Sequence, residues 1–142
     1  MAQTLSDRLN LVVEALPLRE GMRVLEIGCG PGAAAREVVR RIGDGHVHAI
    51  DRSARAIAQA VAQSRGEIET GRLSFEQIAV EDFRLAAGEP RYDLAFAVRV
   101  GALDGRHPEA GQRAVLRLAD ALTPHGLLLV GDGPSMTPLR RL

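Results

Sequence analysis

VLEIGCGPG, residues Val24 to Gly32, places a carboxylate near the end of an apolar run and alternating glycines directly after it. The apolar run is typical of a short buried strand. The glycines allow the backbone to turn sharply and to approach a ligand closely, because they have no Cβ. The stretch therefore predicts a strand followed by a loop, which is either a ligand site or a tight turn into a helix.

Helical and strand patterns alternate on both sides of this loop. Apolar residues recur at helical spacing after candidate N-caps at Thr4, Asp7 and Ser53, and Gly43 and Gly66 follow expected helix ends. Pro108 suits a first helical position. The predicted helices are 1–17, 33–42, 54–65 and 108–122, and the predicted strands are 22–27, 46–50, 73–78, 92–98 and 127–130.

The order of these elements predicts the fold class. Strands with continuous apolar patterns that alternate with helices favour a parallel sheet covered on both faces. Right-handed crossovers then give a doubly wound α/β fold, a sheet of about five strands in the order 3-2-1-4-5. We expect residues 1–142 to form a single domain with an irregular tail at 132–142.

The composition excludes several classes of partner. The 18 basic and 18 acidic residues cancel, and aromatic residues make up only 3%, so neither a basic field nor stacking platforms favour nucleic acid. Apolar runs are far shorter than the roughly 20 residues of a membrane span. Asp7 and Arg8 interrupt any N-terminal secretory signal, and Cys29 has no partner cysteine. We therefore expect a soluble, cytoplasmic protein with no nucleic-acid or membrane partner.

Two ligands fit the glycine loop. Gly28, Gly30 and Ala33 satisfy the dinucleotide fingerprint, and Asp51 ends the second predicted strand at a suitable spacing for NAD. Glu26, however, would place a carboxylate beside the pyrophosphate, and the chain has no room for a second, substrate-binding domain. NAD is therefore the second choice.

VLEIGCGPG, with HAID after it and the order of elements through LTPHGLLLV, resembles the class I S-adenosylmethionine-dependent methyltransferases over roughly residues 19–131. This resemblance implies a Rossmann-like fold, S-adenosylmethionine as the cofactor and S-adenosylhomocysteine as its product. An acid ahead of the glycines suits a cationic ligand with no phosphate.

The resemblance also implies roles for particular residues. Glu26 matches the acid near the methionine amino group, the glycine loop runs under the methionine moiety, Asp51 matches the ribose acid, and Arg52 matches a position on the adenine face. An exposed charge is an equal alternative for Arg52. The cofactor-binding residues predicted in this way are Glu26, Gly28, Cys29, Gly30, Gly32, Asp51, Arg52, Val80, Glu81, Val98 and Arg99.

The sequence departs from the family pattern after the third strand. Ala79 stands where many members have an Asp that binds adenine, which leaves the backbone of Val80 and the side chains of Glu81 or Asp82 as substitutes. The tetrapeptide with paired prolines of the amino-methyltransferases is absent, which argues against a nucleobase amine as acceptor. We therefore expect a small-molecule acceptor.

His107 is the best-placed candidate for a general base, since an imidazole changes charge near neutral pH. A loop or capping role is the alternative, and Asp104 and Asp132, in loops at strand ends, are similar candidates. His46 and His48 share one face of a strand and are interpreted as packing residues, so no metal site is predicted.

The sequence leaves two functional classes open. The first is a methyltransferase with a small-molecule acceptor, and the second is a catalytically silent subunit that binds the same cofactor. The fifth predicted strand is expected to be an exposed sheet edge, which favours a homodimer through that edge and helix 108–122. A tail folded back over the same face is the alternative to the dimer.

Overall fold

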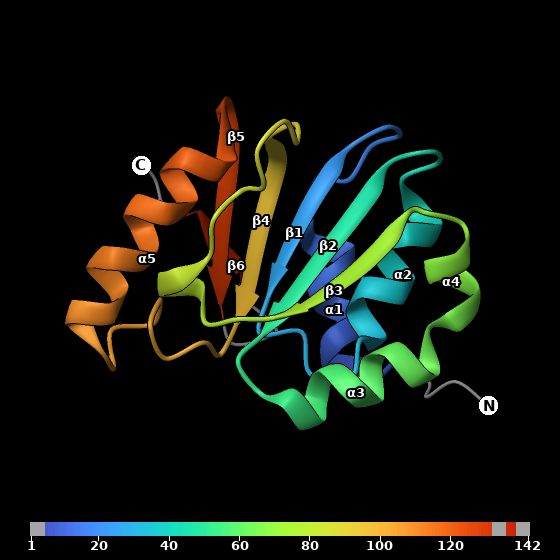
Figure 1. Ribbon diagram of the computed structural model, residues 1–142, viewed down its shortest axis with the longest axis horizontal. Coiled ribbons are helices and arrows are strands. Elements are labelled where there is room, and N and C mark those ends of the chain that lie inside the picture. The colour runs from blue at the N-terminus through green and yellow to red at the C-terminus, as the bar shows by residue number, and fades with distance from the viewer. Residues whose placement is uncertain (1–4, 132–135, 139–142) are drawn as a thin grey trace.

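The computed structural model describes residues 5–131 and 136–138. Their strands form one sheet in the order β3-β2-β1-β4-β5-β6 (Figure 1). The strands are β1 (Arg23–Ile27), β2 (His46–Asp51), β3 (Leu73–Gln77), β4 (Tyr92–Val98), β5 (Leu122–Gly131) and β6 (Met136–Pro138). The helices are α1 (Asp7–Ala15), α2 (Ala33–Arg41), α3 (Ala54–Gln63), α4 (Arg65–Glu69) and α5 (Pro108–Ala121), with a 3-10 turn η1 (Val80–Asp82).

Strands β1 to β5 are all parallel, which confirms the predicted doubly wound fold and its strand order. Successive side chains of a strand point to opposite faces, so each strand supplies two cores. Val24 and Val47 pack with α1 and α2 on one face, whereas Leu25 and Ile50 share the other face with α5 and η1. Figure 1 shows α5 and the helices α1 to α3 on opposite sides of the sheet.

Local interactions set the helix boundaries, and those of the first and third predicted helices differ most from the prediction. The Ser6 side chain accepts a hydrogen bond from the Leu9 N–H, so α1 begins at Asp7; Thr4 lies outside the described residues. Ser53 caps α3 as expected through the Ala56 N–H. The prediction that Gly66 ends this helix is wrong, because the chain turns at Ser64 and a short helix, α4, contains the glycine.

The predicted exposed edge at the fifth strand is also wrong. β5 begins at Leu122, directly after α5, and its far side pairs with β6 in antiparallel register. At Leu129 to Gly131 this edge of the sheet is therefore paired within the chain, with residues 136–138 of the tail predicted to be irregular. The homodimer stays a prediction, without the argument from an unpaired edge. In the described part of the chain, no helix is both long enough and apolar enough to cross a membrane.

Candidate functional site

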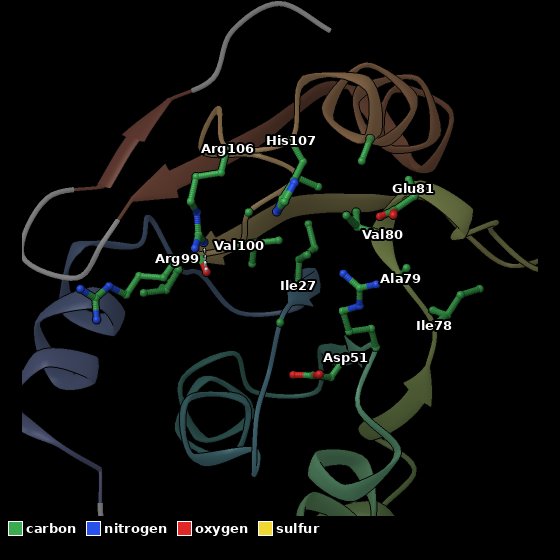
Figure 2. A pocket seen from close by; sticks show the side chains of 16 residues that line it. Ile27, Asp51, Ile78, Ala79, Val80, Glu81, Arg99, Val100, Arg106 and His107 are labelled. Carbon is green, nitrogen blue, oxygen red and sulfur yellow. Dashed lines mark hydrogen bonds between the residues drawn. The ribbon is translucent and has the colours of Figure 1, made fainter.

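A cavity of about 590 Å³ opens at the carboxyl ends of β1, β2 and β4, where a doubly wound sheet binds its ligands. Figure 2 shows Asp51 on one side, His107 on the opposite side and Ile27 between them. The cavity is lined by Ile27, Gly28, Asp51, Arg52, Ile78, Ala79, Val80, Glu81, Val98, Arg99, Val100, Gly101, Ala102, Arg106, His107 and Ala110.

The glycine loop passes from β1 to α2 beside this cavity, and its first glycine is sterically required. Gly28 has φ +72°, and a Cβ there would lie 2.7 Å from Cγ2 of Val100 across the cavity wall. The N–H groups of Gly28 and Cys29 both donate to the Ile50 carbonyl, at 2.8 and 3.0 Å, which ties the loop to β2. The loop therefore brings bare backbone to the cavity at Gly28.

Asp51 holds the loop from the other side. Its Oδ2 accepts from the Gly30 N–H at 2.9 Å, and its Oδ1 accepts from the Ser53 N–H at 2.9 Å. Each carboxylate oxygen has a second lone pair, so both remain able to accept a ligand hydroxyl. Asp51 is thus oriented by backbone donors while it lines the cavity.

Glu26 lies beneath the loop and not on the cavity wall. The residue is 5% exposed, and its Oε1 has no hydrogen-bond partner among the residues that the structure describes. Burial, with a smaller contribution from the Asp51 charge and against the attraction of Arg36, raises the pKa of Glu26 to about 8. A buried carboxyl with an unsatisfied oxygen costs stability, and a cationic group on a ligand would offset that cost. The Glu26 carboxyl thus fits a ligand with a cationic end near the loop.

Arg36 supports the loop from α2. Its guanidinium is buried and donates from Nη1 to the Pro31 carbonyl at 2.9 Å and to the Ser64 Oγ at 2.8 Å. A Cβ at Gly32 would lie 3.0 Å from the same nitrogen. Burial raises the pKa of the neighbouring Cys29 thiol, so this side chain is an unreactive filler of the loop.

The opposite side of the cavity comes from the segment between β4 and α5. Arg99 has φ +56°, a left-handed conformation that only a few per cent of residues other than glycine adopt. Its side chain points away from Asp51 and His107 in Figure 2. His107 precedes α5 without a capping hydrogen bond from its side chain, and its ring lies against Gly101, where a Cβ would be 2.8 Å from Cδ2. His107 is thus the N-cap residue of α5 through its backbone, whose carbonyl accepts from the Gly111 N–H at 2.9 Å, while its side chain lines the cavity.

The segment after β3 forms the remaining wall. Ala79, Val80 and Glu81 line the cavity, as expected for the substitutes of the missing Asp. Asp82 points elsewhere, because its carboxylate accepts a hydrogen bond from Arg113 on α5 at 3.0 Å. Of the two acidic substitutes, Glu81 remains.

The cavity brings together most of the predicted site residues. It is lined by Gly28, Asp51, Arg52, Val80, Glu81, Val98, Arg99 and His107, but not by Glu26, Cys29, Gly30 or Gly32. Sequence reasoning missed Gly101 and Arg106. The Arg106 side chain pairs with Asp104 at 2.8 Å and donates to the Arg99 carbonyl at 3.2 Å. Glycine and charge in the loop after a strand could have drawn attention to both.

His46 and His48, interpreted from the sequence as packing residues, also make polar contacts, and the His48 ring lies 5.9 Å from that of the buried Phe83, centroid to centroid. Both rings take part in hydrogen bonds to Ser74 on the neighbouring strand. Within residues 5–131 and 136–138, no group of three or more His, Cys, Asp or Glu side chains is placed to hold a metal ion. Asp132 lies outside the described residues.

The doubly wound fold, the glycine loop and the acid at the end of β2 together define a Rossmann-like domain. The glycines alone leave open whether its ligand carries a phosphate. A model of the methyltransferase domain family matches residues 24–126, and the chain belongs to this family. The predicted recognition of a class I S-adenosylmethionine-dependent methyltransferase domain is thereby confirmed, and the NAD alternative gains no support.

Known proteins of several kinds are similar to the chain. An S-adenosylmethionine-dependent methyltransferase from Thiobacillus denitrificans, solved with S-adenosylhomocysteine, is 25% identical with a TM-score of 0.68, covering 89% of this chain and 48% of that one. The [4+2]-cyclase SpnF is 28% identical with a TM-score of 0.64, covering 86% of this chain and 42% of that one.

The tRNA N(3)-cytidine methyltransferase METTL2 of Danio rerio is 30% identical over 115 residues, which are 78% of this chain and 31% of that protein. The chain thus spans less than half the length of each of these three relatives.

Proposed function

We propose that the chain binds S-adenosylmethionine in the cavity at the carboxyl ends of β1, β2 and β4, and transfers its methyl group to a small-molecule acceptor. The observation that carries this proposal is the arrangement of Asp51, the glycine loop and the unpartnered carboxyl of Glu26. The cavity of about 590 Å³ lies in the range of small-molecule sites.

Each part of the site has a binding role. Asp51 accepts hydrogen bonds from the two ribose hydroxyls while its backbone donors fix its orientation. Glu26 offers a negative charge to the cationic methionine end, and Gly28 lets that end pass close to the backbone. Val80 and Glu81 receive the adenine on the wall after β3. This arrangement gives the buried Glu26 carboxyl a partner that the described residues do not supply.

Methyl transfer requires little acid–base catalysis by the protein. S-adenosylmethionine, when bound, supplies an electrophilic methyl group on a sulfonium, so the residues mainly position the reactants and exclude water. His107 lies across the cavity from Asp51 and accepts the proton that a hydroxyl or amine acceptor loses. Arg106, beside it, is held by Asp104 at the same side.

A small-molecule acceptor is supported by the charge balance of 18 basic and 18 acidic residues. Neutralising a phosphate backbone requires a surplus of basic side chains. The similarity to a tRNA methyltransferase makes RNA the alternative acceptor to be tested. A catalytically silent subunit that binds the same cofactor is the second alternative, because a protein named as a cyclase shares the fold.

Ligand titration and transfer assays test the proposal separately. Calorimetry with S-adenosylhomocysteine should show binding that Asp51→Asn weakens about ten- to a hundredfold, because a charged acceptor contributes roughly 1.5 to 3 kcal/mol. Asp82→Asn is the matched control, because this exposed acid is adjacent in the sequence to the cavity wall but does not line it. Stabilisation by NAD alone would refute the cofactor assignment.

Labelled S-adenosylmethionine should then give a methylated product with fractions of small metabolites and none with tRNA. Transfer of the label to tRNA would show that the acceptor is RNA and would refute the small-molecule acceptor. Tight cofactor binding with no labelled product in either fraction would refute the transfer activity and favour the cofactor-binding subunit.

A further inference from the structure

A row of polar side chains joins β2 to β3, outside the cavity proposed to bind the cofactor. His46 Nδ1 lies 3.0 Å from the Gly71 carbonyl oxygen, and its Nε2 lies 3.1 Å from the Ser74 Oγ. Ser74 Oγ also lies 2.7 Å from His48 Nδ1, and His48 Nε2 lies 3.0 Å from Glu76 Oε1. We call this row, Gly71–His46–Ser74–His48–Glu76, the histidine chain.

The number of hydrogens in the histidine chain can be counted. Both ends, a carbonyl and a carboxylate, only accept hydrogen bonds, so each of the four contacts needs a hydrogen from the side chains between them. Neutral His46, Ser74 and His48 supply one hydrogen each. Three hydrogens cannot satisfy four contacts, and one contact would leave two lone pairs facing each other.

We propose that the histidine chain is a proton-binding site, which takes up one proton beyond those of neutral histidines and an ionised carboxylate. With this proton, one imidazole donates from both nitrogens and all four contacts are satisfied. The inference rests on the geometry of β2 and β3, and it holds whether or not the neighbouring cavity binds a cofactor.

The proton belongs at the His48 end of the chain. Burial lowers the pKa of His46, so the positive charge is disfavoured on that ring. His48 instead lies between Ser74 and the carboxylate of Glu76, which attracts the charge.

Charged side chains on the neighbouring elements also face the histidine chain. The positive ones disfavour the extra proton and the negative ones favour it. Arg23 on β1 repels a proton, but it pairs with Glu89 at 3.7 Å and its guanidinium stacks 5.1 Å from the ring centroid of Tyr92 on β4. Arg84, before β4, lines a second cavity, which lies beside the histidine chain. Glu76 is therefore the acid in direct contact with the proton, and Glu89 is a more distant one.

A cavity of about 550 Å³ beside the histidine chain gives the proton a path to solvent. Loss of the proton breaks one contact of the row and weakens the lateral attachment of β3 to β2. β3 is an edge strand of the sheet and pairs only with β2 among the described residues. The protonated site thus stabilises the attachment of β3 to β2. This attachment weakens reversibly as the pH rises and the proton is lost.

Glu76→Gln supplies the test, because an amide can donate the missing hydrogen without any charge. In the wild type, long-range proton–nitrogen NMR at neutral pH should show His48 protonated on both nitrogens. In Glu76→Gln, His48 should be neutral and protonated on Nδ1 only. A neutral His48 in the wild type overturns the proposal.

Unfolding measurements give a second, independent readout. Uptake of one proton on folding makes the unfolding equilibrium constant rise up to tenfold per pH unit above neutrality. That contribution should be present in the wild type and in Glu69→Gln, an exposed control on α4, and absent in Glu76→Gln. Ser74→Ala should also remove it, because the two remaining contacts need only neutral rings. Equal pH dependence in the wild type and Glu76→Gln overturns the proposal.

Discussion

Cofactor affinity is expected to rise about fifty-fold between pH 6 and pH 8, because Glu26 must lose a proton to face a cation. The pKa of Glu26 is about 8 in the ligand-free protein, raised mainly by burial at 5% exposure. About one molecule in a hundred carries the ionised form at pH 6, and about half do at pH 8. At pH 7 the deprotonation costs roughly 1.4 kcal/mol of binding free energy.

The assay is calorimetric titration with S-adenosylhomocysteine between pH 6 and pH 8, in two buffers with different enthalpies of ionisation. The difference between the buffers counts the protons released on binding, and it should approach one per site at the acidic end. Glu26→Gln should bind more weakly at pH 8 and show neither the pH dependence nor the proton release. Glu109→Gln, an exposed substitution on the first turn of α5, should behave as the wild type. A wild-type affinity that stays constant across this range, with no proton released, would refute the reasoning.

Three further substitutions separate steric, catalytic and structural roles. Gly28→Ala should destabilise the fold by about 2 to 4 kcal/mol in denaturant unfolding, because the new Cβ meets a neighbouring side chain. Gly30→Ala, with open space around it, is the control and should cost only about 1 kcal/mol, from backbone strain. His107→Asn should lower the transfer rate about a hundredfold with an unchanged cofactor Kd; an unchanged rate would remove the general-base role. Arg36→Met should cost about 2 to 4 kcal/mol in thermal unfolding because it breaks buried hydrogen bonds, against less than about 1 kcal/mol for Arg41→Met in a partly exposed ion pair.

The sequence was most informative where local pattern and topology point the same way. The bounds of β4 match the predicted strand, because its apolar run is bordered by charged residues on both sides. Asp51 and Gly28 lie together because parallel strands place their carboxyl ends at one edge of the sheet. The parallel topology thus turned two distant motifs into one site.

The failures of prediction lie where long-range pairing decides the structure. The tail at 132–142 is predicted to be irregular and Pro138 has no N–H to donate, yet β6 pairs at that position with Leu129 on the edge of the sheet, where a missing N–H is tolerated. The left-handed backbone of Arg99 carries no sequence signal, so the direction of its side chain away from Asp51 and His107 could not be predicted. The histidines on β2 found polar partners on β3 only because the register aligns His48 with Ser74.

The two proton-linked features should act independently, because they lie on opposite faces of the sheet. Glu26 is on the face of Val24 and Ala49, whereas His48 points to the other, and the charges that act on Glu26 are those of Asp51 and Arg36. Because the pKa of Glu26 is raised on folding, its contribution to stability is fully present below about pH 4.5 and is lost as the pH rises through about 8.

Saturating S-adenosylhomocysteine holds Glu26 ionised and should abolish that contribution to the pH dependence, while leaving the contribution of the histidine chain intact. Unfolding measurements with and without this ligand give both contributions to the pH dependence. They are made on the wild type, Glu26→Gln, Glu76→Gln and the double variant. The two substitutions should be additive within about 0.5 kcal/mol at each pH. A larger coupling would mean that both features titrate as one network, and the separate proton counts for the cofactor and for the histidine chain would then be wrong.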